Sequence, residues 1–188
     1  MWNERRLPRL PAEFYQGSAH VMWTYVVKDR RQGWLGDAFH SLFRERLLHT
    51  CARYHLGCAR YVLMPDHLHL IWVGAAARSD QLKATKFLRR YLPLEWVKQP
   101  HDHVLREEAR ERNAFADTCN YLRQNPVRAK LVESAQDWDF AGSMVPGFPD
   151  LNEWESDSFW KCFSAYQKSL LDETQEVQPA PIRRIEDT

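Results

Sequence analysis

Hydrophobic and polar positions follow two periods along the chain, and these periods predict its strands and helices. Apolar runs of strand length, several of them alternating with polar residues, cover 20–28, 58–64, 67–73 and 101–106. Apolar residues at helical spacing cover 39–56, 79–97 and 107–125. Met64-Pro65-Asp66 has the residues of a tight turn between two antiparallel strands. The order of the elements predicts an α+β fold of the ferredoxin-like class, an antiparallel sheet with helices packed on it.

The segment 39–56 indicates how a helix packs on this sheet. Its apolar residues form one stripe, namely Phe39, Leu42, Phe43, Leu47, Cys51 and Tyr54. Gly57 is expected to end the helix, because glycine readily takes the left-handed conformation of helix C-termini. Cys51, His55 and Cys58 superficially match a zinc cluster, but a structural zinc normally has four ligands. We therefore interpret Cys51 as a core residue.

His67 and His69 are the most informative polar positions, because they lie one residue apart in the apolar run 67–73. Side chains of a strand alternate between its faces, so both imidazoles point to one side and Leu68 points to the other. The pair offers two ligands to a metal ion. Two half-exposed histidines on a strand face remain the simpler interpretation of this motif alone. In a regular strand, Asp66 would point away from His67.

Tyr121 and Asn125 lie four residues apart near the end of the predicted helix 107–125, so they share one helix face. Pro126 is expected to end the helix, because proline disfavours the helical conformation in the residue before it and has no N–H. A phenol and an amide oxygen are thus presented together. A core tyrosine and a polar residue at a helix end are the ordinary alternative.

Two segments of the sequence resemble the REP-associated tyrosine transposases, which are HUH single-strand tyrosine transposases. The segment 62–70 reads VLMPDHLHL, and the segment 121–132 reads YLRQNPVRAKLV. Weaker similarities near residues 6–8, 14–17, 101–106 and 137–140 extend the resemblance over roughly residues 5 to 145.

The resemblance implies the HUH endonuclease fold and a role for each matching residue. His67, His69 and Asn125 would hold one divalent cation, either Mg²⁺ or Mn²⁺, of which imidazole ligands favour the second. Tyr121 would attack a phosphate of single-stranded DNA and become joined to the 5′ end, releasing a 3′-hydroxyl. The DNA would be a short imperfect palindrome folded as a hairpin. The active form would be a monomer or a homodimer.

Two further functions are compatible with the same residues. A domesticated, non-catalytic protein would keep the fold and bind hairpin DNA without cutting it. A metal-dependent nuclease would use a bound water as the nucleophile, and Tyr121 would then be structural. A covalent protein–DNA adduct distinguishes the transposase from both.

The net charge of +1 conceals an uneven distribution. Residues 1–135 contain 22 Lys and Arg against 14 Asp and Glu, whereas residues 136–188 contain 4 against 11. A basic domain with an acidic tail is typical of polyanion binders, although ordinary surface charge also explains a near-neutral total. The basic residues expected to contact DNA are Arg5, Arg6, Lys83, Lys86, Arg89, Arg90 and Arg128.

The helix 79–97 is expected to separate its basic residues from an apolar stripe. That stripe consists of Ala84, Phe87, Leu88, Tyr91 and Leu92. Arg9, Arg30 and Arg31 form a second basic cluster around the first strand, and nearby aromatic residues such as Tyr15 and Trp34 are suited to stacking on unpaired bases.

Length and composition limit the remaining choices. A chain of 188 residues with 44% hydrophobic content suits one domain, expected over 1–145. An acidic extension over 146–188 is expected to be partly helical, around 159–171, and then disordered. The sequence has no run of eighteen apolar residues and no secretion leader, so we expect a cytoplasmic protein without a membrane span. Its four scattered cysteines are typical of reduced thiols.

Overall fold

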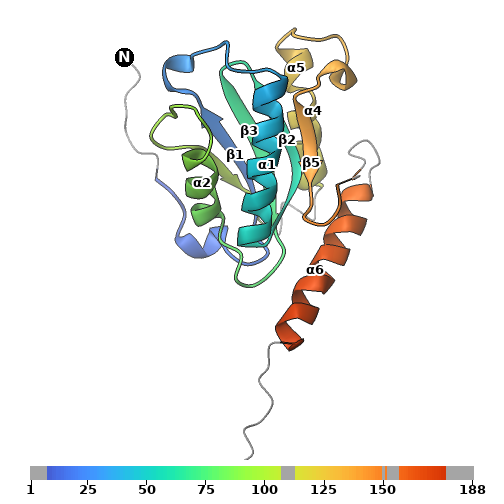
Figure 1. Cartoon of the computed structure of the whole chain (residues 1–188). Helices are drawn as coiled ribbons and strands as arrows, with labels where there is room; N and C mark the ends of the chain where they lie inside the picture. The colour runs from blue at the N-terminus through green and yellow to red at the C-terminus, as the bar shows by residue number, and fades with distance from the viewer. Residues whose placement is uncertain (1–7, 107–112, 150, 152–156, 177–188) are drawn as a thin grey trace, which may run out of the picture.

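A five-stranded antiparallel sheet forms the centre of the protein (Figure 1). The computed structural model describes residues 8–106, 113–149, 151 and 157–176. The strands are β1 (His20–Val26), β2 (Leu56–Met64), β3 (His67–Gly74), β4 (His101–Val104) and β5 (Ala141–Met144). Their order across the sheet is β4-β1-β3-β2-β5, so β3 is the central strand and pairs with β1 and β2. The predicted α+β architecture is confirmed.

The helices are divided between the two faces of the sheet. They are α1 (Asp37–Tyr54), α2 (Gln81–Arg90), α4 (Ala114–Arg123), α5 (Asn125–Arg128) and α6 (Ser158–Glu176). Short 3₁₀ segments are η1 (Ala12–Tyr15), η2 (Lys28–Arg30) and η3 (Ala135–Asp137). Figure 1 shows α1 and α2 in front of the sheet and α4 behind it.

The core between the sheet and α1 and α2 is built from alternate strand residues. Leu68, Leu70 and Trp72 of β3 are fully buried and belong to one cluster with Phe43 of α1 and Leu88 of α2. Burial of each such side chain stabilises the folded protein by on the order of 1.5–3 kcal/mol. These even-numbered residues of β3 therefore point toward α1 and α2.

The opposite face of β3 carries the odd-numbered residues and is covered by α4. Ile71 is fully buried in a cluster with Val62, Met64 and Leu122 of α4. Because strand side chains alternate, His69 lies on the same face as Ile71. The histidine pair and the helix that carries Tyr121 thus share one side of the sheet.

The segment around Tyr121 differs from the single helix predicted for 107–125. Within the described residues α4 starts at Ala114 and ends at Arg123, while 107–112 lie outside the described residues. Pro126 does not stop a continuous helix. It occupies the first turn of the separate helix α5, where its missing N–H costs no hydrogen bond.

Two other helix ends differ from the sequence prediction. The predicted role of Gly57 as the end of α1 is wrong, because His55 takes the left-handed conformation there with φ 52°. Gly57 instead lies in β2, where an added Cβ would be 2.6 Å from the ring of Phe163. Helix α2 is shorter than predicted and ends at Arg90, before Pro93 restricts the backbone.

Strand β5 and the length of α6 were not predicted. The sequence Ala-Gly-Ser-Met of β5 has no β-branched or aromatic residue, so only its pairing with β2 identifies it as a strand. Phe163 and Tyr166 of α6 are buried in a cluster with Val73 and Val145. The division at residue 145 stays a prediction. Disorder was predicted for 175–188, which is wrong at 175 and 176 because α6 includes them, and 177–188 lie outside the described residues.

The interpretation of Cys51 as a core residue is confirmed, because it is fully buried in the α1 and α2 layer. The four cysteines are free thiols. In the described part of the chain, no three His, Cys, Asp or Glu side chains are grouped so that they hold a metal ion. No helix among the described residues has the length and apolar composition needed to cross a membrane.

Candidate metal and nucleophile site

The imidazoles of His67 and His69 meet at their Nε2 atoms, which lie 3.1 Å apart. The two rings are close to perpendicular, with centroids 4.7 Å apart. Both residues project from the start of β3, where His69 is opposite Thr24 and His67 is opposite Val26 of β1. The predicted convergence of the two histidines is confirmed.

Asp66 orients the ring of His67. Nδ1 of His67 donates a hydrogen bond to Oδ1 of Asp66 at 2.6 Å. A carboxylate only accepts, so the proton of the neutral ring is on Nδ1 and the lone pair is on Nε2. The expectation that Asp66 points away from His67 is wrong, because Asp66 belongs to the turn between β2 and β3, where strand alternation does not apply.

Arg30 completes this arrangement from the other side of Asp66. Its guanidinium donates to Oδ2 of Asp66 at 2.7 Å, and the N–H of Val27 donates to the Asp66 carbonyl at 3.0 Å. Burial alone would raise the pKa of Asp66, but the hydrogen bonds from His67 and Arg30 outweigh it and lower that pKa. Asp29 and Arg30 both have left-handed backbone, with φ 56° and 49°. This conformation costs non-glycine residues about 1–2 kcal/mol each, and the Asp66 ion pair offsets part of that cost.

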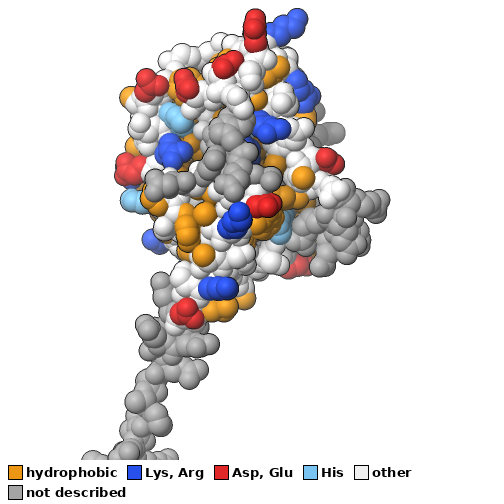
Figure 2. Space-filling model, turned by 90° about the vertical axis from the view of Figure 1, so that its right-hand side faces the viewer, with side chains coloured by type: hydrophobic (Ala, Val, Ile, Leu, Met, Phe, Trp, Pro, Cys, Tyr) orange, Lys and Arg blue, Asp and Glu red, His pale blue; other side chains and the backbone are white. Residues whose placement is uncertain are grey.

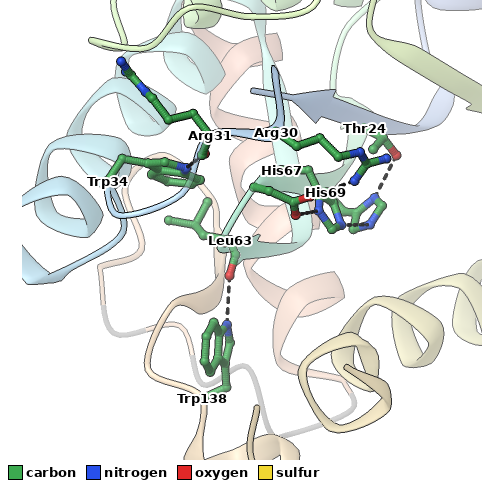
Figure 3. A network of polar contacts seen from close by, with 9 residues as sticks. Thr24, Arg30, Arg31, Trp34, Leu63, His67, His69 and Trp138 are labelled. Atoms are coloured by element: carbon green, nitrogen blue, oxygen red, sulfur yellow. Dashed lines mark hydrogen bonds and ion pairs between the residues drawn. The ribbon is translucent and has the colours of Figure 1, made fainter. Parts of the chain in front are cut away.

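Thr24 holds the second histidine. Its Oγ1 lies 2.7 Å from Nδ1 of His69, and Figure 3 shows Arg30, His67, His69 and Thr24 lying close together in one network of polar contacts. Burial, followed by the charge of His67, lowers the pKa of His69 to about 3. His69 is therefore neutral at pH 7, which is the form that binds a metal ion.

The geometry of the pair fits a cation. With Nδ1 of His67 bonded to Asp66, its Nε2 presents a lone pair toward His69. If the hydroxyl of Thr24 accepts a proton from Nδ1 of His69, then the second Nε2 also presents a lone pair. Two lone pairs facing one another at 3.1 Å repel, and a cation bound by both nitrogens removes that repulsion. Further ligands must come from other residue types, such as the amide of Asn125, or from water and substrate.

Tyr121 is on α4, and its side chain is 44% exposed. The next residue, Leu122, packs against Ile71 on the sheet face that carries the histidines. Nδ2 of Asn125 donates to the Tyr121 carbonyl at 3.3 Å, so the two residues are adjacent as the helical spacing predicts. The guanidinium of Arg128 lies 4.3 Å from the centre of the Tyr121 ring. Arg128 was predicted only as a DNA contact, and this aromatic contact was missed.

The other predicted DNA contacts have different surroundings. Lys83, Lys86 and Arg90 are exposed on the outer side of α2, which belongs to the opposite face of the sheet. Arg89 is partly buried and donates to the carbonyls of Val97 and Lys98, so it is tied to the loop after α2. Arg5 and Arg6 lie outside the described residues.

Charges on the side with α6 do not form one patch. Figure 2 shows that side, and its basic and acidic side chains are interspersed among those drawn in colour. The described residues of this side therefore carry no broad positive field.

Sequence reasoning missed Thr24 as the partner of His69 and Arg30 as the partner of Asp66. Thr24 is 45 residues from His69, and Arg30 is 36 residues from Asp66. Only strand pairing brings Thr24 and His69 together, since β1 and β3 are neighbours in the sheet. Trp138 was likewise missed as an anchor, and its indole N–H donates to the carbonyl of Leu63 at 2.9 Å next to the β2–β3 turn (Figure 3).

Comparison with known proteins identifies chains that are similar to this one. No protein-family profile matches the chain. A Haemophilus influenzae protein named as a REP-associated tyrosine transposase is 26% identical over 151 residues, which are 69% of this chain and 81% of that protein. The chain is similar to the REP-associated tyrosine transposases. The predicted resemblance is thereby confirmed.

Comparison of the fold with solved structures identifies the same group of transposases. A solved REP-associated tyrosine transposase, bound to a REP hairpin, has 18% sequence identity and a TM-score of 0.61. The similarity covers 72% of this chain and 81% of that one. The sheet and helices described above are therefore the fold of a REP-associated tyrosine transposase.

Proposed function

We propose that this protein is a DNA strand transferase that cuts and rejoins single-stranded DNA beside a hairpin. Tyr121 is the nucleophile in this proposal, and His67, His69 and Asn125 hold a divalent cation, Mg²⁺ or Mn²⁺. The proposal includes the hairpin substrate because the structural relative was solved with a REP hairpin.

One observation carries the proposal. The two sequence segments that resemble the transposases are separated by 52 residues between His69 and Tyr121, yet both belong to the same side of the sheet. Leu122 and Ile71 pack together between them. A histidine pair and an exposed phenol on one face are the groups that a phosphodiester transfer through tyrosine requires.

The chemical step balances without water. Oη of Tyr121 attacks the phosphorus and forms a new P–O bond, while the P–O3′ bond of the DNA breaks. The phenol proton passes to solvent, and the departing O3′ takes up a proton and becomes a free hydroxyl. The 5′ phosphate remains on Tyr121, so attack by a 3′-hydroxyl reverses the step and rejoins the strand. A bound divalent cation would polarise the phosphate and offset its developing charge.

The test is formation of a covalent adduct. Hairpin DNA carrying a 3′ label is incubated with the protein and a divalent metal, then resolved under denaturing conditions. We expect the parent to carry the label covalently and Tyr121→Phe to carry none, although it binds the hairpin as the parent does. Thr118→Val removes a hydroxyl from the same helix and should form the adduct normally, since Thr118 bonds only its own helix backbone among the contacts described.

Two outcomes would support other functions. If Tyr121→Phe nicks the DNA at the parent's rate, water is the nucleophile and the protein is a metal-dependent nuclease. If the parent binds hairpin DNA but never cuts it, the protein is a non-catalytic hairpin-binding module.

A further inference from the structure

A groove lies between the C-terminal end of α1 and the outer side of α2. It has a volume of about 370 Å³, within the range of small-ligand sites. Its lining residues are Arg53, Tyr54, Lys83, Lys86, Phe87, Arg90 and Tyr91. Because α1 and α2 cover the face of β3 opposite His69, the groove is separate from the candidate metal and nucleophile site.

Four of the lining residues are cations, and none of the described lining residues is acidic. Arg53, Lys86 and Arg90 are exposed, and 70% of the Lys83 side chain is exposed. Lys83 has an acidic neighbour, Asp80, at 3.2 Å, one turn before it at the helix start. The groove therefore concentrates positive charge, which suits a phosphate-bearing ligand.

Three aromatic residues line the groove beside the cations. The ring of Phe87 lies 5.7 Å from that of Tyr54 and 4.7 Å from that of Tyr91. The guanidinium of Arg53 lies 5.3 Å from the Phe87 ring centre, and that of Arg90 lies 5.8 Å from the Tyr91 ring centre. These aromatic rings and guanidinium groups therefore lie close enough together to form a surface on which another planar group can stack.

Tyr91 is an exposed ring among the aromatic residues that line the groove. Its spacing in the sequence predicted a core position, but its side chain is 48% exposed, because α2 ends at Arg90 and leaves Tyr91 at the rim. An exposed ring beside cations has a π-face that an unpaired base can stack on.

We propose that this groove binds an unpaired nucleotide of single-stranded DNA, with the base on Tyr91 and the flanking phosphates on Arg53, Lys86 and Arg90. This inference rests on the proposed function for the identity of the strand. It adds a second contact region on the opposite side of the sheet from the chemistry. A single strand is favoured over a duplex because the bases of a duplex already stack on one another and expose no face to Tyr91.

The test measures binding of a fluorescent oligothymidylate without a hairpin, by anisotropy over a range of salt concentrations. Tyr91→Leu should weaken binding about fivefold or more, the effect of removing the platform for one stacked base. Replacing both Arg53 and Arg90 with Gln should flatten the slope of log affinity against log salt by about 1.4, or about 0.7 for each phosphate that is no longer neutralised. Phe14→Leu removes another exposed ring and Lys168→Gln another exposed cation, and both should bind as the parent does.

Other results would overturn the inference. Equal weakening in Tyr91→Leu and Phe14→Leu, or an unchanged salt slope in the arginine variant, would mean that the groove is ordinary surface. If a duplex of the same length binds as tightly as the single strand and Tyr91→Leu has no effect, the site contacts duplex backbone instead. Adduct formation by the parent is measured separately on hairpin DNA. Its absence beside normal groove binding would overturn only the proposed function.

Discussion

Oγ1 of Thr24 lies 2.7 Å from Nδ1 of His69, across a register pair of β1 and β3. A hydroxyl can donate or accept, so it serves both tautomers of the imidazole. Without a cation, Thr24 donates to Nδ1, and Nε2–H of His69 donates to Nε2 of His67. With a cation between the rings, Thr24 accepts from Nδ1–H and leaves the His69 Nε2 lone pair for the metal.

This relationship predicts different behaviour for two substitutions of Thr24. Thr24→Val keeps the shape but cannot hydrogen bond, so affinity for Mn²⁺ should fall about 10- to 100-fold, the usual effect of removing a partner of a metal ligand. Thr24→Ser keeps the hydroxyl and should retain most of the affinity. Titration calorimetry with Mn²⁺ measures both, and equal affinities in the Val and Ser variants would rule out the role of the hydroxyl.

The Asp66 carboxylate should matter for the same reason on the other ring. Asp66→Ala leaves Nδ1 of His67 without its acceptor and Arg30 without its ion pair, so Mn²⁺ affinity should again fall about 10- to 100-fold. Asp37→Asn removes an exposed carboxylate from the start of α1 and is the matched control. A similar decrease in both variants would point to general electrostatics instead of ring orientation.

Removal of the histidines should separate cleavage from binding. His67→Ala or His69→Ala should abolish metal-dependent adduct formation, while hairpin affinity stays within about threefold because affinity depends mainly on phosphate contacts. His101 and His103 have the same spacing on β4 and are exposed, so replacing them with Ala provides the control. Cleavage by both site variants in the presence of a chelator would exclude the metal-dependent mechanism.

Arg128 should influence the rate at Tyr121. Its guanidinium lies 4.3 Å from the centre of the ring and restrains the phenol. Arg128→Gln should slow adduct formation at saturating DNA about two- to fivefold, in proportion to the roughly 0.5–1 kcal/mol of an exposed cation–π contact. Lys130→Gln removes an exposed cation two residues later and should leave this rate unchanged. If only DNA affinity changes in Arg128→Gln, the residue is a phosphate contact alone.

Gly74 at the end of β3 should tolerate no side chain. A Cβ there would lie 1.7 Å from the carbonyl oxygen of Gly17, so the backbone must move. We expect Gly74→Ala to lower the free energy of unfolding by about 1–3 kcal/mol. Gly36→Ala is the control, because that residue has extended backbone and its added Cβ would meet nothing within 4 Å. Denaturant unfolding followed by fluorescence compares the two, and equal midpoints would contradict this expectation.

The alternation of residues in β3 was sufficient to predict the face that the histidines share. His67 and His69 differ by two positions from one another and by one from Leu68, and that parity is a local property of an extended chain. The adjacency of Tyr121 and Asn125 is likewise local, although the helix break at Gln124 was not expected. The two segments that resemble the transposases are also continuous in the sequence, so no structure was needed to identify them.

Tertiary structure alone decided what surrounds these residues. Strand pairing brings Thr24 to His69 across 45 residues of sequence. Asp66 contacts His67 from the turn, and Arg30 contacts Asp66 across 36 residues. The sequence determined the residues of the candidate site and the strand and helix that carry them, because period and motif are local. Structure determined the partners of the rings, the exposure of Tyr91 and the pairing of β5, because these depend on which distant segments pack together.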